Sequence, residues 1–311
     1  ANSVVEYVLT AIAAVGEKLE QLLAGGVVGI VGYGHVGKAL ATRLEALGIT
    51  HRVYDPWLEQ DTIPSAASLG EVMDCDVVSL HPELTRASPW PSHHLVGTDE
   101  LASLRADALL INASRGAVIN NGALLAQLEK ERERAVVLDV WEGEPVISPA
   151  LLERVLLGTP HIAGYSLGAK LRATQMLGEA VAKFLQQPAP KPRTAGVEAP
   201  SIRLDKPGSK ADLLRELLQS RYAIREDDAR LRQVVLEQGD ENGAGFDRLR
   251  KRYRERRELA GSAVSYACLP ETIRMFPLPD ELATMLTDVG LRDVGWTSMT
   301  NGISVAHVGT K

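Results

Sequence analysis

The chain has 311 residues, of which 45% are apolar, and this is enough for two or three domains with a sizeable core. Its formal net charge of -6 argues against a nucleic-acid partner, because non-specific binding needs a basic face. No apolar run approaches the length of a membrane span and no segment resembles a signal peptide, so we expect a cytoplasmic protein with no membrane partner. Cys75 and Cys268 lie far apart without metal-binding spacing, which is typical of reduced thiols.

The N-terminal segment has apolar residues at helical spacing over residues 3–23 and predicts one helix. The chain begins at Ala1, already in helical phase. A natural chain seldom begins inside a helix, so we expect that an N-terminal part is absent. We therefore interpret residues 1–24 as an interdomain helix and the remnant of a substrate domain. We also expect the chain as given to bind its cofactor but to be inactive.

Short apolar runs alternate with helical stretches along the next part of the chain. The predicted strands cover residues 27–31, 51–54, 76–80, 108–112 and 135–139. A helix follows the first strand as far as Leu47, and Ser68 with Glu71 forms a capping box for another. This alternation predicts an α/β fold, a Rossmann-type doubly wound parallel sheet over residues 25–165. Ligands bind such sheets at the carboxyl ends of the strands.

The regular alternation of predicted strands and helices ends towards the C-terminus. Ser148 and Pro149 begin a helix, a return helix is expected over 166–187, and residues 188–200 form a proline-rich linker. Helical stretches follow at 210–221, 226–236 and 246–257, with another helix near 279–288. Strand-like segments lie at 263–268 and 303–307. Residues 201–311 therefore predict a separate small α/β domain.

A Gly-x-Gly-x-x-Gly motif follows the first predicted strand and opens a helix, as a dinucleotide site requires. Its residues are Gly32, Gly34, His35, Val36 and Gly37. The glycines permit a tight turn, close approach of the backbone to a pyrophosphate and close helix packing, and the helix N-terminus attracts the anion. Asp55 ends the next strand, where a carboxylate binds the ribose diol and repels a 2′-phosphate. The predicted cofactor is NAD rather than NADP, a preference that nearby Arg52 slightly weakens.

Three residues that follow predicted strands can handle a 2-hydroxy acid. The guanidinium of Arg115 can hold a carboxylate, and Glu144 can fix the tautomer of His161 so that the imidazole transfers a proton. Asp139 ends its strand and can contact the nicotinamide or support the site. Adjacent His93 and His94 suggest a metal, but no third ligand is evident, so we expect no metal site.

Three sequence segments resemble the D-isomer-specific 2-hydroxyacid dehydrogenase family. They are Asn112-Ala-Ser-Arg-Gly-Ala-Val, Leu138-Asp-Val-Trp-Glu-Gly-Glu-Pro and Gly158-Thr-Pro-His-Ile-Ala-Gly-Tyr-Ser. The last two also resemble the narrower erythronate-4-phosphate dehydrogenase branch, and the likeness extends from about residue 1 to about residue 290. The resemblance implies catalysis by Arg115, Glu144 and His161. The residues that it implies as NAD contacts, with those of the glycine motif, are Asp55, Ala113, Ser114, Asp139 and Gly164.

The resemblance also implies a substrate and an assembly. Arg115 and Tyr165 would bind a small phosphorylated 2-hydroxy acid. The reaction would be oxidation of 4-phospho-D-erythronate to (R)-3-hydroxy-2-oxo-4-phosphooxybutanoate by NAD in pyridoxal 5′-phosphate biosynthesis. Residues 201–311 would make a homodimer, in which Arg256 or Arg257 could reach the partner's substrate phosphate.

One departure from the family pattern matters. The chain has Pro82-Glu83 where relatives usually have Thr-Pro, which puts one NAD contact in doubt.

Two alternative functions stay open. One is that of another D-2-hydroxyacid dehydrogenase, such as one for 3-phosphoglycerate. The other is a non-catalytic NADH-sensing scaffold.

Overall fold

The computed structural model describes residues 1–131, 134–166, 169, 176–177, 179–180, 182–184, 186, 208–237, 242–254, 292–299 and 304–310. Several expectations lie outside the described residues. They are most of the return helix, the proline-rich linker, the strand at 263–268, the helix near 279–288, Cys268, Arg256 and Arg257. Among the described helices, none has both the length and the apolar character that crossing a bilayer demands.

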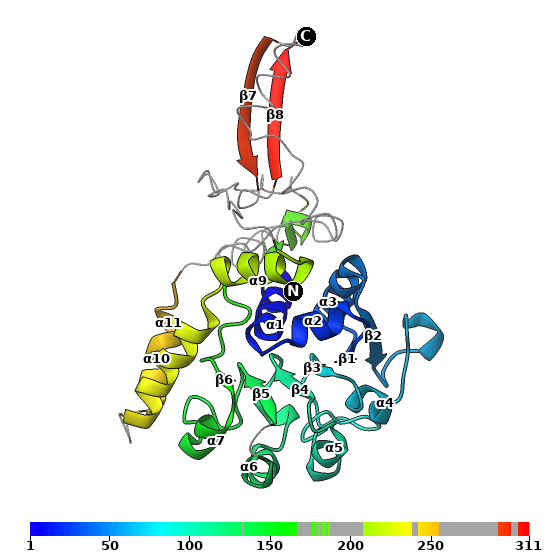
Figure 1. Cartoon of the computed structure of the whole chain (residues 1–311), viewed down its shortest axis with the longest axis vertical. Coiled ribbons are helices and arrows are strands. Elements are labelled where there is room, and N and C mark those ends of the chain that lie inside the picture. The colour runs from blue at the N-terminus through cyan, green and yellow to red at the C-terminus, as the bar shows by residue number, and fades with distance from the viewer. Residues whose placement is uncertain are drawn as a thin grey trace.

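The centre of the molecule is a six-stranded parallel sheet in the order β2-β1-β3-β4-β5-β6 (Figure 1). Its strands are β1 (Val27–Val31), β2 (Thr50–Tyr54), β3 (Val77–Leu80), β4 (Leu109–Asn112), β5 (Ala135–Leu138) and β6 (Leu157–Gly158). A single parallel bridge between Val53 and Ala66 continues the sheet beyond β2. The Rossmann-type fold is confirmed, and the two-residue strand β6 is an element that the sequence pattern did not predict.

Helices cover both faces of this sheet because neighbouring strand residues point to opposite sides. Val77, Leu109 and Val137 belong to one hydrophobic cluster, whereas Val78, Leu110 and Leu138 belong to the other. The first cluster packs under α1 (Asn2–Ala14), α2 (Lys18–Leu23) and α3 (His35–Leu47). The second packs under α4 (Leu69–Met73), α5 (Thr98–Ser103), α6 (Asn121–Lys130) and α7 (Pro149–Arg154). Figure 1 shows these helix groups above and below the strands.

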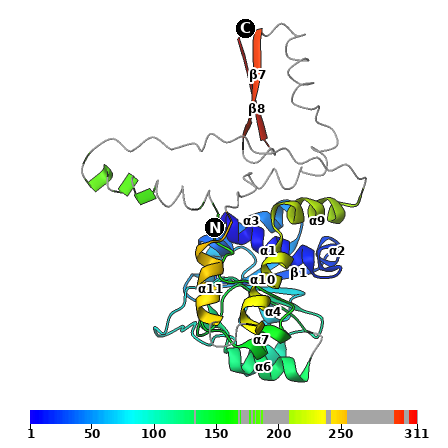
Figure 2. The ribbon, with the colours of Figure 1, turned by 90° about the vertical axis from the view of Figure 1, so that its left-hand side faces the viewer.

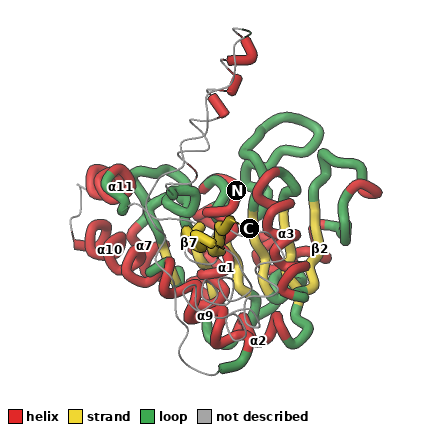
Figure 3. Tube along the Cα trace, turned by 90° about the horizontal axis from the view of Figure 1, so that it is seen from above, coloured by secondary structure: helices red, strands yellow, loops and turns green. Residues whose placement is uncertain are grey.

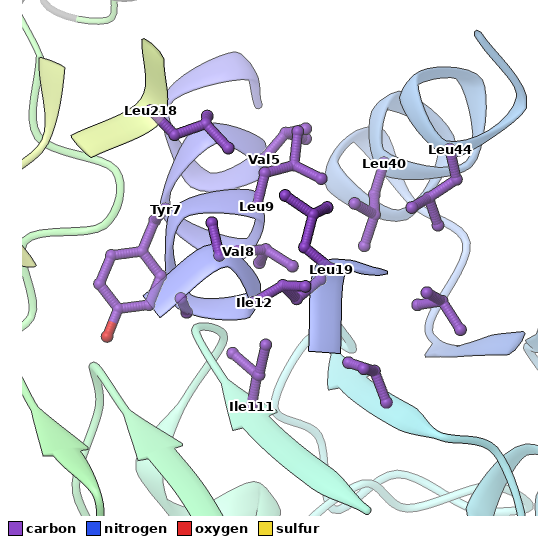
Figure 4. Packing of buried hydrophobic residues seen from close by; sticks show 14 of the residues in the cluster. Val5, Tyr7, Val8, Leu9, Ile12, Leu19, Leu40, Leu44, Ile111 and Leu218 are labelled. Carbon is purple, nitrogen blue, oxygen red and sulfur yellow. The ribbon is translucent and has the colours of Figure 1, made fainter. Parts of the chain in front are cut away.

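The N-terminal segment forms two helices, so the expectation of one helix over residues 3–23 was wrong. The chain breaks between α1 and α2 at Gly16, whose φ of +45° suits glycine. The break lets both pieces lie on the sheet: Figure 4 shows Val8 and Ile12 of α1 and Leu19 of α2 directed at one cluster with Ile111 of β4.

In the described part of the chain after residue 208, the helices are α9 (Lys210–Arg221), α10 (Ile224–Glu237) and α11 (Asn242–Lys251). They overlap the predicted helical stretches, but α11 ends at Lys251, so the expectation of helix at residues 252–254 was wrong. Leu214, Leu217 and Leu218 of α9 belong to the same cluster as α1, and Figure 2 shows α10 and α11 against the body of the sheet domain. A domain boundary near residue 201 stays a prediction, but these helices share the hydrophobic core of residues 1–166.

Polar contacts also fasten the C-terminal helices to the core. Arg215 pairs with Glu20, and its Nε donates to the carbonyl of Ala13 at 3.1 Å. Asp228 accepts the backbone N–H of Gly158 in β6 at 2.7 Å. Figure 3 shows α9 beside α2, although the two helices are far apart in the sequence. Removing α9 would therefore expose apolar surface of the sheet domain.

The last described element is an antiparallel hairpin of β7 (Arg292–Met299) and β8 (Ser304–Thr310). The strand expected at 303–307 is confirmed within β8. Its partner β7 was not predicted, because Gly295 and a register irregularity between Arg292 and Gly295 interrupt the strand pattern.

Candidate active site

The glycine turn joins β1 to α3 at the carboxyl edge of the sheet. Gly32 has a φ of +93°, and a Cβ there would lie 2.6 Å from the backbone nitrogen of Pro82. A Cβ on Gly37 would lie 2.0 Å from the carbonyl oxygen of Gly32, so only glycine permits this helix to start so close to the strand. Open space surrounds Gly34, which begins α3. The turn can therefore admit a pyrophosphate against the helix N-terminus, where His35 is exposed and Val36 half-buried.

Asp55 follows β2 and is tied to the same turn. One carboxylate oxygen accepts the backbone N–H of Tyr33 at 2.8 Å, and the other accepts that of Trp57 at 3.0 Å. These bonds hold the carboxylate at the rim of a cavity of about 300 Å³, which Gly32, Pro82 and Glu83 also line. Asp55 is thus placed where a ribose next to the glycine turn would lie.

Two tryptophans lie at the rim of this cavity. Trp57 and Trp90 both line the cavity, and the indole N–H of Trp57 donates to the carbonyl of Trp90 at 3.1 Å. About half of each side chain is exposed, 52% and 48%. Aromatic faces at a cavity rim can stack on a planar ring. No sequence periodicity pairs these two residues, because they lie on separate loops.

His81 lies behind the cavity, directly before Pro82. Burial lowers its pKa to about 3, so the imidazole stays neutral in the folded protein. Its Nε2 lies 2.9 Å from the hydroxyl of Ser79, while Nδ1 has no hydrogen-bond partner. The backbone of His81 and Pro82 packs on Gly32, so this buried residue supports the floor of the glycine turn.

Arg115 lies on the loop after β4, whose shape is set by Asn112. The side chain of Asn112 accepts from the backbone N–H and the hydroxyl of Ser114 and donates to the carbonyl of Arg115. Arg115 is exposed, Ser114 is buried and Ala113 is half-buried. The next residue, Gly116, has no room for a side chain, because a Cβ would lie 2.0 Å from the carbonyl carbon of Trp141. The loop of Arg115 is therefore packed on the loop that carries Glu144.

Asp139 ends β5 and is fully buried. Its carboxylate accepts from the hydroxyl of Thr159 at 2.7 Å and from the backbone N–H groups of Ile162 and Ala163 at 2.8 and 2.9 Å. Its pKa is raised because burial outweighs these hydrogen bonds. The backbone carbonyl of Asp139 also accepts the N–H of His161 at 2.7 Å. These contacts support the loop of His161, and a direct contact with NAD stays a prediction.

His161 and Glu144 form the pair that the sequence predicted. Nδ1 of His161 lies 2.5 Å from a carboxylate oxygen of Glu144, and the other oxygen accepts the backbone N–H of Trp141 at 3.1 Å. Each side chain is 23% exposed, so a small molecule can reach the pair. His161 has a φ of +56°, an uncommon conformation for a non-glycine residue that is often found at functional sites. Since Glu144 occupies Nδ1, the other ring nitrogen, Nε2, is the atom that can exchange a proton.

A second cavity, of about 210 Å³, was not predicted from the sequence. Pro160, next to His161, lines it together with Arg230, Arg248, Tyr253, Arg252, Arg254, Leu249 and Asp227. The ring of Tyr253 packs edge-on against that of Tyr165, which the sequence predicted as a substrate contact. Gly164, a predicted NAD contact, adjoins α1, and its carbonyl accepts the hydroxyl of Ser3 at 3.3 Å.

The expectation of no third ligand near His93 and His94 was wrong. Glu142 approaches them from the loop after β5, and one ligand atom from each of the three residues lies within 4.8 Å of the others. The carboxylate is far away in sequence, so spacing alone could not bring it to the histidines.

The chain matches three family models. Residues 13–163 match the model described as D-isomer specific 2-hydroxyacid dehydrogenase, NAD binding domain. Residues 195–275 match a domain of unknown function, DUF3410, and residues 256–311 match the ubiE/COQ5 methyltransferase family. The region that we expected to be one dimerisation domain is thus matched by two different models.

Sequence relatives match over most of the chain. An erythronate-4-phosphate dehydrogenase from Cellvibrio japonicus is 43% identical, over 88% of this chain and 73% of that protein. One from Marinobacter nauticus is 42% identical, over 85% of this chain and 71% of that protein. Among solved structures, a D-lactate dehydrogenase from Treponema pallidum is 25% identical with a TM-score of 0.50, over 60% of this chain and 67% of that one.

Proposed function

The chain belongs to the erythronate-4-phosphate dehydrogenases, within the D-isomer-specific 2-hydroxyacid dehydrogenase family, and we propose that it oxidises 4-phospho-D-erythronate with NAD. The product is (R)-3-hydroxy-2-oxo-4-phosphooxybutanoate, an intermediate of pyridoxal 5′-phosphate biosynthesis. The observation that carries this proposal is the pair of His161 and Glu144, which lies on the carboxyl side of the sheet, as the glycine turn does.

NAD, when bound, accepts the hydride from C2 of the substrate. The residues of the glycine turn fit such a cofactor, because Gly34 is open to a phosphate and α3 begins there. Asp55 would bind the ribose hydroxyls and disfavour a 2′-phosphate. The cavity that it lines includes Pro82 and Glu83, so the departure from the family pattern lies at the cofactor site.

His161 would act as the base for oxidation. The hydroxyl proton on C2 moves to Nε2 while the C–O bond becomes a carbonyl, and Glu144 stabilises the imidazolium that results. The guanidinium of Arg115 would bind the substrate carboxylate and orient C2. The intact trio also distinguishes this proposal from a non-catalytic NADH-sensing scaffold, which needs no proton acceptor.

The arginine-lined cavity supports a phosphorylated substrate. Arg230 and Arg254 each form ion pairs with Glu226 and Asp227. Arg248 and Arg252 have no such partner among the described residues, so their charges are available to an anion. Guanidinium groups bind phosphate oxygens through paired N–H donors. We place the 4-phosphate of the substrate in this cavity, beside Tyr253 and the neighbouring Tyr165.

We further propose a homodimer formed through the segment after residue 201, and a cytoplasmic location. Two-fold symmetric dimers are the commonest oligomers of soluble proteins. The helices α9 to α11 pack on the sheet domain and leave exposed apolar residues such as Leu236, which a partner subunit could cover.

The test is a substrate comparison on the complete gene product that contains this chain. NADH formation is measured with 4-phospho-D-erythronate, 3-phospho-D-glycerate and D-lactate at equal concentrations. We expect kcat/KM for 4-phospho-D-erythronate to exceed the other two values by at least about 10²-fold. A higher value for 3-phospho-D-glycerate would instead support the other dehydrogenase considered from the sequence. NADH binding without turnover of any of the three acids would support the scaffold.

A further inference from the structure

We propose that His93, His94 and Glu142 form a binding site for a divalent transition-metal ion of the zinc type. The donor set is two imidazoles and one carboxylate, and their ligand atoms lie within 4.8 Å of one another. Zinc sites with three protein ligands of this kind keep a fourth position for water. Borderline donors favour zinc, cobalt or copper over magnesium or calcium.

The backbone on both sides of the cluster is held in place before any ion binds. The N–H of His94 donates to the carbonyl of Ala117 at 2.7 Å, and that of His93 donates to the carbonyl of Thr85 at 3.1 Å. Asn121 holds Glu142 through two bonds: its backbone N–H donates to the carboxylate at 3.2 Å, and its side-chain oxygen accepts the N–H of Glu142 at 3.1 Å. Ligands fixed in this way lose little conformational freedom when an ion binds.

The two histidine rings are presented side by side. Their centroids are 4.0 Å apart and their planes differ by 34°. This arrangement depends on His94, whose φ of +54° is uncommon for a residue other than glycine. Within the described part of the chain, no hydrogen bond or ion pair ties the His93 ring to another residue. It is therefore free to turn its nitrogen towards an ion.

An ion can reach the cluster with a small movement. The side chains of His94 and Glu142 are each 34% exposed. Nε2 of His94 lies 2.6 Å from a carboxylate oxygen of Glu142. Two ligands of one tetrahedral zinc ion lie about 3.4 Å apart, given bond lengths near 2.0–2.1 Å. Binding therefore opens this pair by less than about 1 Å and replaces its shared proton with the ion.

A metal ion bound at this site would connect two loops on the same side of the sheet. Residues 93 and 94 precede α5, whereas Glu142 lies two residues before Glu144, the partner of His161. A bound ion therefore restrains the loop of the catalytic carboxylate without using any group that we assign to the reaction. This inference is independent of the substrate, and its test needs no turnover.

The experiment uses the tag-free chain after treatment with a chelator. Zn²⁺ is titrated by calorimetry, and Co²⁺ is followed by its visible absorption, which reports four-coordinate geometry. We expect one ion per chain. At a Zn²⁺ concentration of 100 times the dissociation constant, the unfolding equilibrium should shift about 100-fold towards the folded state.

Single substitutions test which residues bind the ion. His93→Asn should weaken Zn²⁺ binding at least about 10-fold and keep the fold, because no hydrogen bond ties the ring to another residue in the described structure. Glu142→Gln should weaken it too, with NAD binding measured as a check that the chain is folded. His307→Asn, a histidine in β8, is the matched control and should leave binding unchanged. Unchanged binding in His93→Asn would overturn the proposal. If Zn²⁺ binding is lost in His161→Asn but not in the other variants, the proposal is also overturned, because the ion would then be bound by His161 and Glu144.

Discussion

Nδ1 of His161 lies 2.5 Å from Oε1 of Glu144, and the two residues come from different loops at the carboxyl side of the sheet. The backbone of Asp139 holds the histidine, and the backbone N–H of Trp141 holds the glutamate. The carboxylate at Nδ1 favours the tautomer that carries its proton there, which leaves Nε2 as the nitrogen that can accept a proton.

Replacing either member of this pair should reduce turnover. His161→Gln should lower kcat by about 10²–10⁴-fold, because the proton acceptor is lost, while the NAD dissociation constant changes little. Glu144→Gln keeps the shape but removes the charge that stabilises the imidazolium, so kcat should fall at least about 10-fold. The control is Glu153→Gln, an exposed glutamate of α7. Steady-state kinetics on the complete gene product measures all three. Normal turnover in Glu144→Gln would remove it from the mechanism.

Cofactor choice should depend on Asp55. Asp55→Asn keeps one carbonyl oxygen for the backbone N–H groups but lowers the attraction for the ribose diol and the repulsion of a 2′-phosphate. We expect the preference for NADH over NADPH to fall about 10- to 100-fold, as for loss of a charged hydrogen bond. Fluorescence titration of both cofactors measures the ratio. Asp61→Asn, on the exposed turn after the same strand, serves as the control. Equal affinity of the parent chain for NADH and NADPH would contradict the assignment of Asp55 to the ribose.

The arginine-lined cavity makes a separate prediction. Arg252→Ala should raise KM for 4-phospho-D-erythronate about 10- to 100-fold, because one charged contact to phosphate is lost. D-erythronate, which lacks the phosphate, should be little affected by the same change. Arg250→Ala is the matched control, since Arg250 is an exposed arginine near the end of α11, two residues before Arg252, but does not line the cavity. If both variants change KM equally, the effect is one of general charge and the cavity does not hold the phosphate.

Buried His81 should make the folded protein sensitive to acid. Its pKa is about 3 in the folded protein, against an ordinary value of 6.5. Between these two pH values, the unfolded chain therefore binds a proton at His81 that the folded protein does not bind. Stability is therefore lost as the pH falls below about 6.5. The loss assigned to His81 between pH 7 and pH 5 should be about 2 kcal/mol. Urea unfolding at both pH values measures it, with His81→Gln as the comparison. A variant with the same pH dependence as the parent chain would show that His81 is not the titrating group.

The sequence by itself determined the elements that depend on local patterns. Short apolar runs between helical stretches identified five of the six strands, because buried parallel strands are mostly apolar. The exception is β2, in which exposed and buried residues alternate. The glycine motif, Asp55, the capping box of Ser68 and Glu71, and the predicted pair of Glu144 and His161 are all seen in the structure. Glycine at position 32 is required by a positive φ and a close neighbour, and such a requirement is visible in a single sequence.

Only the tertiary structure decided which distant residues meet. Glu142 reaches His94 across 48 positions, and Trp57 reaches Trp90 across 33. Arg248 of α11 and Arg252, which follows that helix, are far from Pro160 in the sequence, yet packing brings them to the same cavity. The break at Gly16 and the shared core of α1 and α9 also depend on the sheet against which they pack. Loops at strand ends have no period that determines their partners, so their contacts follow from the order of the strands and from burial.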